Sequence, residues 1–451
     1  MIREADAGTE SRFTRIQQWL KMAAITVGID FGTTNSSLAR RIGDSTGIDL
    51  LRVPLFGVAT ESYRSLLYLE QTREHNKNRL ASWTGPEGIE HYLARETGGR
   101  LIQSLKSFLS SRSLQSTEIF GRRVTIEDLV ARILRDLKEK AEQQFGTRIN
   151  SAVAGRPVRF VGAETEKDSQ YAESRLRSAF ELAGFEHVEF EMEPVAAAHH
   201  YESTLTRDEL ILIGDFGGGT SDFSIIRVGP AIRKRGRTPA DLLGHAGVGI
   251  AGDTFDAKIV RHLVSPHLGA GTKMRSVDKI LPVPGWVYAN LERWHHLSFL
   301  KAKETMQLLN SVRAQALEPD KIGALIDLVD EDLGYHLHRA VQKTKCDLST
   351  QSISQFRLSQ AAFEVDAVAD RASFETWISE ELDAIASCVD SLLRRASVSR
   401  ADIDAVFLTG GSSFVPAVRR IFEARFGRER IQTGDEFTSV ARGLALRGRK
   451  M

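Results

Sequence analysis

The chain has 451 residues, enough for two or three domains, and its 42% hydrophobic and 26% charged residues are typical of a globular protein. The 60 basic and 59 acidic side chains leave a net charge of +1, so nothing in the charge balance points to nucleic acid or a membrane as a partner. Two cysteines are too few for a disulfide framework and no apolar run reaches the roughly 18 residues of a membrane span, so we expect a cytoplasmic protein.

Residues 1–22 mix both charge signs and lack the apolar core of a signal peptide, so they are interpreted as an N-terminal extension. The next segment, Ala24–Ala39, reads AITVGIDFGTTNSSLA, and its two apolar runs around a turn of small residues predict strand, turn and strand. Glu209–Ser224 reads ELILIGDFGGGTSDFS and repeats the pattern, with Asp30 and Asp215 in equivalent places. The repetition predicts two similarly built lobes, each of which offers a loop to a shared cleft.

The residues of these two loops suit a phosphate and a divalent cation. Glycine lets the backbone come close to a ligand, and successive backbone amides then form a nest for phosphate oxygens. The loop glycines are Gly32, Gly217, Gly218 and Gly219, and the hydroxyl donors beside them are Thr33, Thr34 and Thr220. The carboxylates of Asp30, Asp215 and Asp222 are hard oxygen ligands of the kind that Mg²⁺ takes.

Two later glycine motifs are weaker. Residues 247–252 spell GxGxxG, but no clear apolar strand leads into them, so they are interpreted as another loop close to the backbone rather than a dinucleotide site. Ala405–Arg420 reads AVFLTGGSSFVPAVRR and predicts a strand, a glycine pair and a helix, an arrangement in which a nucleotide can lie near the helix N-terminus. The chain has no GxxxxGK[ST] motif and no zinc-like histidine spacing.

The motifs VGIDFGTTNSS, EPVAAA, GDFGGGTSDFSI, AGDTFDAKI and LTGGSS occur in the order found in the ATPase domain of the DnaK-type heat shock protein 70 family. The chain resembles this family, which implies an α/β protein with the actin-like ATPase fold: two duplicated ribonuclease-H-like lobes around a nucleotide cleft, each with an inserted subdomain. The implied boundaries are lobe I at 23–208 with an insertion near 52–126, lobe II at 209–429 with an enlarged insertion near 251–386, and a C-terminal segment at 430–451 that returns to lobe I.

The resemblance also implies roles for single residues. Asp30 and Asp215 resemble the aspartates that hold the water shell of Mg²⁺, and Lys106 resembles the lysine that reaches the γ-phosphate and the attacking water. Glu193 and Asp222 match carboxylates that position this water or accept its proton. Thr33, Thr34 and Thr220 resemble the hydroxyls around the β- and γ-phosphates. The residues implied in binding ATP or ADP are Gly32, Thr33, Thr34, Asn35, Gly217, Gly218, Gly219, Thr220, Gly252, Asp253, Gln342, Lys345, Cys346, Ser349, Gly410, Gly411 and Ser412.

The sequence departs from the family on the adenosine side. The matching helix is predicted at Val341–Ser349, where Gln342 loses a charge and Cys346 cannot stack a guanidinium plane on adenine. We therefore expect a weaker or altered base clamp. The chain is also longer than the family pattern between Asp256 and Val341, which we interpret as an added helical subdomain, so standard nucleotide-exchange factors are not expected to fit.

No peptide-binding domain follows the last motif, so the resemblance is to an ATPase-domain-only, YegD-like branch of the family. It implies a weak Mg²⁺-dependent ATPase whose nucleotide state switches lobe closure, read by an unknown protein partner or client. Two alternatives stay open: a small-molecule kinase of the same superfamily and an actin-like polymerising ATPase.

Overall fold

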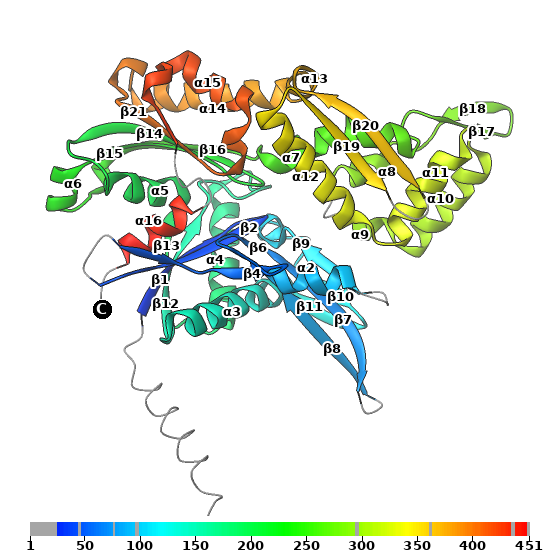
Figure 1. Cartoon of the computed structure of the whole chain (residues 1–451), viewed down its shortest axis with the longest axis horizontal. Helices are drawn as coiled ribbons and strands as arrows, with labels where there is room; N and C mark the ends of the chain where they lie inside the picture. The colour runs from blue at the N-terminus through cyan, green and yellow to red at the C-terminus, as the bar shows by residue number, and fades with distance from the viewer. Residues whose placement is uncertain are drawn as a thin grey trace, which may run out of the picture. The chain divides into compact units, whose positions relative to one another are not determined.

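The structure is a computed structural model, and it describes residues 25–43, 47–74, 77–94, 99–293, 297–359, 363–433 and 438–448. The predicted extension at 1–22 lies outside these residues. The chain divides into two compact units: unit 1 consists of residues 1–249, 392–410 and 430–451, and unit 2 consists of residues 250–391 and 411–429. Figure 1 shows the elements of both units in chain colours.

The first sheet of unit 1 is built around β1 (Ile25–Phe31), which pairs antiparallel with β2 (Asn35–Arg41) and parallel with β12 (Ile149–Arg156). Its strand order is β13-β12-β1-β2-β3, where β13 is His187–Met192 and β3 is Ile48–Leu50, and β6 (Tyr63–Arg64) pairs with β2 off this path. The predicted strand, turn and strand at Ala24–Ala39 are therefore confirmed as β1 and β2.

The second sheet of unit 1 repeats this topology. Its central strand, β14 (Glu209–Phe216), pairs antiparallel with β15 (Ser221–Val228) and parallel with β21 (Ala405–Thr409). The order is β16-β15-β14-β21-β22, where β16 is Leu242–Val248 and β22 is Ile431–Thr433. Two sheets with the same order and the same pairing directions confirm the predicted α/β class with a duplicated architecture.

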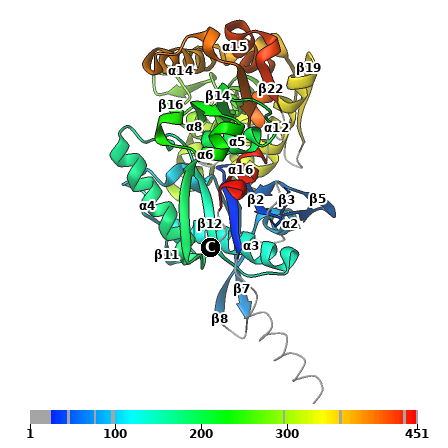
Figure 2. The same cartoon turned by 90° about the vertical axis from the view of Figure 1, so that its left-hand side faces the viewer.

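Helices cover the first sheet on both faces. Val27, Ile29 and Phe31 of β1 join a buried core with α3 (Ile126–Phe145) and α4 (Glu166–Leu182), whereas the alternate residue Gly28 faces α16 (Ser439–Arg447). Figures 1 and 2 show α16 and α5 (Glu193–Glu202) between the two sheets. A Cβ atom at Gly443 would lie 1.7 Å from the Ala196 carbonyl oxygen, so these two helices meet backbone to backbone.

The remaining elements of unit 1 lie outside these two sheets and the helices already described. Between the first sheet and α3 lie β4 (Val53–Leu55), β5 (Val58–Thr60), β7 (Leu66–Glu74), β8 (Lys77–Thr84), α2 (Gly85–Ala94), β9 (Arg100–Gln103), the 3₁₀ turn η1 (Leu105–Phe108), β10 (Ser116–Ile119) and β11 (Arg122–Thr125). Beside the second sheet lie α6 (Pro230–Arg235), η2 (Pro239–Asp241) and η6 (Arg400–Asp402). The i, i+3, i+4 apolar spacing of Ile126–Phe145 predicts a crossover helix, and the structure confirms it as α3, which begins with a capping box at Thr125.

Unit 2 contains most of the remaining helices. Its elements are α7 (Gly252–Ile259), η3 (Val260–Val264), η4 (Ser265–Leu268), β17 (Lys273–Ser276), β18 (Lys279–Pro282), α8 (Trp286–Leu291), α9 (Leu297–Leu300), α10 (Lys303–Gln315), α11 (Pro319–Asp330), α12 (Gly334–Thr350), β19 (Ile353–Ser359), β20 (Glu364–Asp370), α13 (Arg371–Trp377), η7 (Gly411–Phe414), α15 (Pro416–Phe426) and η8 (Arg428–Arg430), and α14 (Ser379–Ala396) runs from unit 2 into unit 1. The stretch between Asp256 and Val341 is largely helical, as predicted, but the β17–β18 hairpin was not foreseen.

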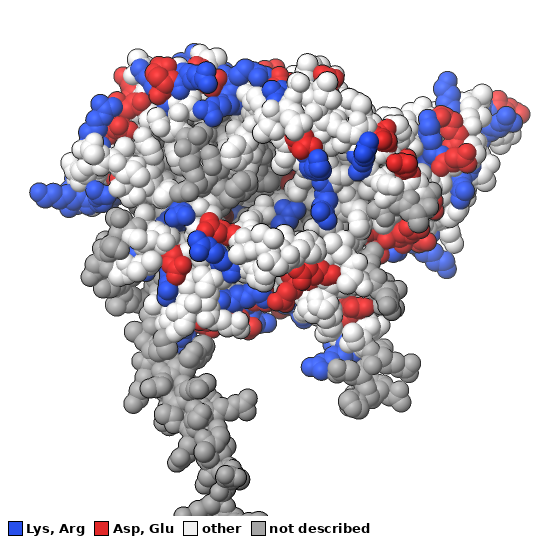
Figure 3. Space-filling model, in the orientation of Figure 1, with Lys and Arg blue, Asp and Glu red and all other residues white. Residues whose placement is uncertain are grey.

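The i, i+3, i+4 apolar spacing of Glu375–Ala396 predicts a crossover helix over this range, but α13 ends and α14 begins around Ile378, whose φ of −98° and ψ of 11° depart from helical values. None of the helices within the described ranges is long and apolar enough to cross a membrane. On the face drawn in Figure 3, basic and acidic side chains are interspersed, in keeping with the net charge of +1.

Candidate functional site

The first glycine loop joins β1 to β2. A Cβ atom at Gly32 would lie 2.1 Å from the Asn35 carbonyl oxygen, so the turn has room only for glycine. Thr33 is buried, and the Thr34 carbonyl accepts a hydrogen bond from the Ser65 amide. The side-chain oxygen of Asn35 accepts a hydrogen bond from Arg64 at 2.9 Å, so this predicted nucleotide contact is already engaged within the protein.

The second glycine loop joins β14 to β15. Its turn is closed by a hydrogen bond from the Gly217 amide to the Thr220 carbonyl, and Asp215 and Asp222 lie opposite each other across the two strands. The two loops come close together within unit 1. A Cβ atom at Gly219 would lie 3.5 Å from the Thr33 hydroxyl oxygen and 2.8 Å from a methyl carbon of Val161.

Lys106 and Glu193 form a buried ion pair beside these loops. Lys106 lies in η1, the turn that follows β9, and Glu193 is the first residue of α5. The Lys106 ammonium is 2.5 Å from the Glu193 carboxylate, and both residues are 7% exposed. The N-terminal turn of a helix favours a carboxylate, so the start of α5 is a suitable place for Glu193.

Burial and mutual repulsion perturb the aspartates around this pair. Burial, helped by the Glu193 carboxylate, raises the pKa of Asp30 to about 7, and the same causes raise the pKa of Asp222 to about 7. Burial and the carboxylates of Glu193 and Asp30 hold the pKa of Asp215 well above its ordinary value. Burial opposes the charge on Lys106, but the surrounding carboxylates outweigh it and raise the pKa of Lys106.

Asp222 is fixed by groups from two loops. It accepts a hydrogen bond from the Val158 amide at 2.9 Å, and the Thr220 hydroxyl donates to it. Val158 follows Pro157, directly after the end of β12. The Val158 amide is a contact that sequence reasoning missed, because a backbone group leaves no signature in residue types.

The donor set fits a hydrated divalent cation. Four carboxylates surround one ammonium, and burial, together with repulsion between these carboxylates, raises the pKa values of the three aspartates. Among the described residues, no three His, Cys, Asp or Glu side chains converge closely enough to hold a metal by themselves. Mg²⁺ suits such a place because it keeps several waters and takes only one or two carboxylates together with phosphate oxygens.

The residues predicted on the adenosine side lie in unit 2. Gly252 and Asp253 begin α7, and Gln342, Lys345, Cys346 and Ser349 share α12. The Lys345 ammonium is 2.8 Å from Asp256 and donates to the Gly252 carbonyl at 3.2 Å, which ties α12 to the start of α7. Cys346 is exposed, and partial burial of its thiol raises the pKa of Cys346, so this side chain is a neutral thiol. The Ser349 hydroxyl donates to the Lys345 carbonyl within the helix.

The third glycine loop crosses the boundary between the units. Gly410 belongs to unit 1 and has a φ of +84°, and a Cβ atom there would lie 2.2 Å from the Phe216 carbonyl oxygen. This position therefore needs glycine for both its conformation and its space. Gly411 and Ser412 belong to unit 2, where they begin η7, and Ser412 is buried.

The interpretation that no strand leads into residues 247–252 is wrong. The GxGxxG motif at 247–252 is preceded by a strand, β16, and α7 begins at its last glycine. Gly244, His245 and Gly247 interrupt the apolar pattern of β16, which is why the sequence did not show it. Gly247 lies in β16 rather than in a loop, and a Cβ atom there would lie 2.5 Å from the Asp222 carboxylate.

The predicted phosphate-side residues thus come together inside unit 1, and the predicted adenosine-side residues come together inside unit 2. Sequence reasoning also missed Arg175 of α4, which is 4% exposed. The sequence spacing could have identified Arg175 as buried, because it falls three residues after Ala172 and four before Ala179 in the buried stripe of that helix. A charged residue at a core position of a helix calls for a partner.

Comparison with known proteins places this geometry in a family. The model of the family described as Hsp70 protein matches residues 105–276 and 316–449. The chaperone protein DnaK of Prochlorococcus marinus is 26% identical over 443 residues, covering 94% of this chain and 58% of the relative. The chloroplastic stromal 70 kDa heat shock-related protein of Pisum sativum is 24% identical over 442 residues, covering 93% of this chain and 52% of the relative.

The chain spans about half the length of the curated relatives it matches. The family match begins at residue 105, and between its two ranges it leaves 277–315 uncovered, within the stretch that the sequence identified as longer than the family pattern. Assignment to the YegD-like branch stays a prediction. The family match, which covers most of the chain, and the duplicated sheets together show that this chain belongs to the Hsp70 family, in the actin-like ATPase superfamily.

Proposed function

We propose that the chain binds ATP with Mg²⁺ and hydrolyses it slowly to ADP and phosphate, and that the bound nucleotide changes a surface which a partner protein reads. The observation that carries this proposal is the buried Lys106–Glu193 pair, which lies with three aspartates beside two glycine loops. A chaperone-like role is part of the proposal, because the matched relatives carry the names of chaperones and heat-shock proteins. A cytoplasmic location is also part of it.

Each group has a task in this chemistry. The backbone amides of the glycine loops and the hydroxyls of Thr33, Thr34 and Thr220 would hold the β- and γ-phosphates. Asp30 and Asp215 would hold Mg²⁺ through its water shell, and the ion, when bound, would neutralise charge on the phosphates. Catalysis of phosphoryl transfer to water consists mainly of positioning and charge stabilisation, so preformed groups in a buried site suit it.

Lys106 and Glu193 would serve the attacking water. The Lys106 ammonium can donate to the γ-phosphate and to the water, and the Glu193 carboxylate orients that ammonium. Asp222, whose pKa of about 7 lies close to neutral pH, is suited to accept a proton from the water. Gln342, Lys345, Cys346 and Ser349 of α12 would face the adenosine, and we retain the prediction that the base clamp is weaker than in the family pattern.

The test is phosphate release from Mg-ATP by the full chain and by the variants Lys106→Ala and Asp215→Asn. Lys321→Ala is the matched control, because Lys321 is a surface lysine of α11 paired with Glu318. We expect slow release in the parent and control proteins, no sustained turnover in either site variant, and only a low residual rate when single turnovers are followed. Calorimetry with ADP and ATP shows whether each protein still binds nucleotide.

The other outcomes separate the alternatives. If no nucleotide binds, the proposal is wrong and only the family membership remains. If ATP binds but is never hydrolysed, the protein is a nucleotide sensor rather than an ATPase. Release of ADP that depends on an added sugar would indicate a small-molecule kinase, and light scattering that rises with ATP and protein concentration would indicate a polymerising ATPase.

A further inference from the structure

The segment that carries Lys106 is a chain of tight turns. Ser104 has a φ of 53°, in the left-handed region that a non-glycine residue rarely adopts. The amides of Ser107 and Leu109 bond back to the carbonyls of Ser104 and Lys106, three residues earlier. The backbone carbonyls that follow such turns do not lie in a sheet or a long helix, whose regular hydrogen bonds would satisfy them. A buried carbonyl nevertheless needs a hydrogen-bond donor.

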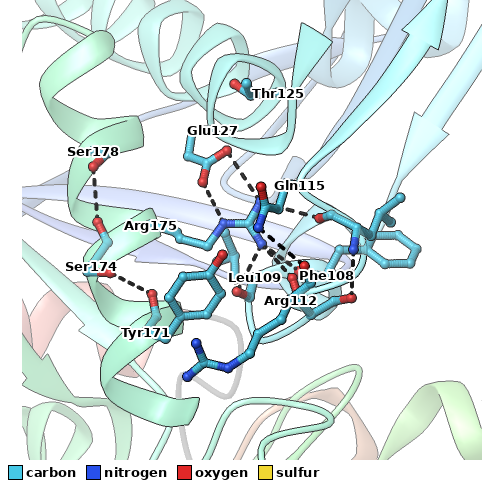
Figure 4. A network of polar contacts seen from close by, with 12 residues as sticks. Phe108, Leu109, Arg112, Gln115, Thr125, Glu127, Tyr171, Ser174, Arg175 and Ser178 are labelled. Carbon is cyan, nitrogen blue, oxygen red and sulfur yellow. Dashed lines mark hydrogen bonds and ion pairs between the residues drawn. The ribbon is translucent and has the colours of Figure 1, made fainter. Parts of the chain in front are cut away.

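Arg175 of α4 donates to the carbonyls of four residues of the segment, of which Phe108 also accepts a hydrogen bond from the Ser111 amide. One terminal guanidinium nitrogen donates to the carbonyls of Phe108, Leu109 and Ser111, each at 3.1 Å. The other donates to the Leu114 carbonyl at 3.4 Å. Figure 4 shows the guanidinium among these carbonyls, and Leu109 is fully buried.

Glu127 and Tyr171 fix the orientation of this guanidinium. The Arg175 Nε atom is 2.5 Å from one carboxylate oxygen of Glu127, and a terminal nitrogen is 3.3 Å from the other. The guanidinium carbon lies 5.5 Å from the centre of the Tyr171 ring. Glu127 is in the first turn of α3 and Tyr171 is on α4, so the group is held by two long helices that pack on the first sheet.

The same segment contacts the loop beside the second glycine turn. The Ser110 hydroxyl donates to the Val161 carbonyl at 2.5 Å, and a Cβ atom at Gly219 would lie 3.8 Å from the Ser107 hydroxyl oxygen. The position of the Lys106 backbone is therefore determined on one side by these loops and on the other by Arg175.

We propose that Arg175, oriented by Glu127, is a positioning residue that holds segment 104–114 so that the Lys106 ammonium stays at its place beside Glu193. This inference rests on the proposed function, because it assigns Arg175 to the hydrolysis step through Lys106. A lysine at 175 would keep the charge but lose the planar fork that bonds several carbonyls at once, so the segment would be held less firmly.

The experiment measures kcat and KM for Mg-ATP in Arg175→Lys and Glu127→Gln. Because a shift of about 1 Å in a reacting group can cost about a hundredfold in rate, we expect kcat to fall at least about tenfold while KM stays within about twofold. The matched control is Arg177→Lys. Arg177 lies on the same helix and also donates to a backbone carbonyl, that of Val188 on β13, which is remote from the Lys106 segment.

A second readout separates positioning from general support of the fold. Arg175→Lys is also made in a Lys106→Ala background, and phosphate release is followed in single turnovers. If Arg175 acts through Lys106, Arg175→Lys does not lower the rate any further in the Lys106→Ala background. A purely structural loss instead lowers the rate in both backgrounds by the same factor. Hydrogen exchange of amides 105–111 is compared in all variants, and faster exchange is expected in Arg175→Lys but not in Arg177→Lys. Glu127→Gln, which keeps the Arg175 side chain and removes only the carboxylate charge that orients it, serves if Arg175→Lys does not fold.

A kcat for Arg175→Lys within twofold of that for Arg177→Lys, or equal losses in the two Lys106 backgrounds, would overturn the inference while leaving the proposed function intact. Absence of hydrolysis by the parent protein would instead overturn the proposed function. Hydrogen exchange would then decide whether Arg175 holds the segment, since equal exchange in the two arginine variants would contradict it.

Discussion

At the scale of single residues, the site sets the ammonium of Lys106 against the carboxylates of Glu193, Asp30 and Asp222. Taking such charges out of water is costly, and the cost is offset only if they are closely paired. The 2.5 Å contact between Lys106 and Glu193 provides this pairing. Burial and the Glu193 carboxylate nevertheless raise the pKa of Asp30 and that of Asp222 to about 7.

Glu193→Gln tests this pair. The amide keeps the shape but leaves the Lys106 ammonium with weaker partners, so we expect the free energy of unfolding to fall by about 2 kcal/mol, less than for a fully isolated buried charge. We also expect kcat to fall about a hundredfold, within the usual range for loss of a group that handles the attacking water. Denaturant unfolding and phosphate release measure the two effects.

Glu142→Gln is the control for this prediction. Glu142 is 8% exposed, pairs with Lys138 at 3.1 Å and accepts from the Ile149 amide, all away from the site. The Glu142→Gln variant should lose about as much stability as Glu193→Gln, while its kcat is unchanged. Equal losses of kcat in the two variants would contradict the role given to Glu193.

At the scale of elements, α5 and α16 hold the two sheets of unit 1 together. The contact is close because Gly443 of α16 lies against the backbone of Ala196, next to the turn of α5 that carries Glu193. Gly443→Ala would gain up to about 1 kcal/mol of helix propensity. We expect the overlap at 1.7 Å to outweigh this gain and to lower the free energy of unfolding by about 1–3 kcal/mol.

Chemical denaturation of Gly443→Ala measures this effect against Gly285→Ala. Gly285 has a φ of −69° and no atom within 4 Å of the added Cβ, so alanine should be tolerated there. An unchanged midpoint for Gly443→Ala would mean that the two helices are less tightly packed than described.

Near the C-terminal end of α5 lies a histidine whose environment makes the stability of the folded protein depend on pH. His199 lies 3.0 Å from an Arg237 nitrogen and 3.9 Å from Glu191. Burial, with help from Arg237, lowers the pKa of His199 despite the opposing effect of Glu191. The unfolded chain therefore binds more protons than the folded one as the pH falls through about 6.5, so this group makes the protein less stable towards acid.

We expect His199→Gln to show a smaller loss of stability than the parent protein between pH 7.5 and pH 5. Urea unfolding at the two pH values measures the difference. His267→Gln, which replaces an exposed histidine of η4, is the control and should behave like the parent. A parallel loss in His199→Gln and in the parent would show that His199 does not carry the effect.

At the scale of the whole molecule, nucleotide and metal are expected to act together. ADP that binds only the folded protein adds about 2.7 kcal/mol to the free energy of unfolding at a concentration 100 times its Kd. We expect a thermal shift of several degrees with Mg-ADP that largely disappears when the metal is chelated, because the carboxylates of Asp30 and Asp215 then repel the phosphates.

Differential scanning fluorimetry of the parent and of Asp215→Asn, each with ADP and with or without a chelator, measures this coupling. The asparagine variant should depend less on the metal, since one repelling carboxylate is gone. The same shift with and without chelator in the parent protein would argue against a metal between the aspartates and the phosphates.

The sequence by itself determined the local elements and their duplication. The turn at Gly32 depends on residue type, because a Cβ atom has no room there, and the apolar runs on either side of each glycine turn in AITVGIDFGTTNSSLA and its repeat predicted β1, β2, β14 and β15 correctly. The apolar pattern of the sequence did not predict β16, because small and polar residues interrupt that strand. It also did not predict the break at Ile378, where a single residue ends a helix.

Only the tertiary structure decided what surrounds each charged group. The pairing of Lys106 with Glu193, 87 positions apart, and the clamp of Arg175 on the carbonyls of Phe108 and Leu109 depend on which distant segments the sheets bring together. The physical reason is that hydrogen bonds and ion pairs act over a few ångströms in space, so residue order alone does not specify them. The raised pKa values of the aspartates likewise arise from burial, which is a property of the folded chain.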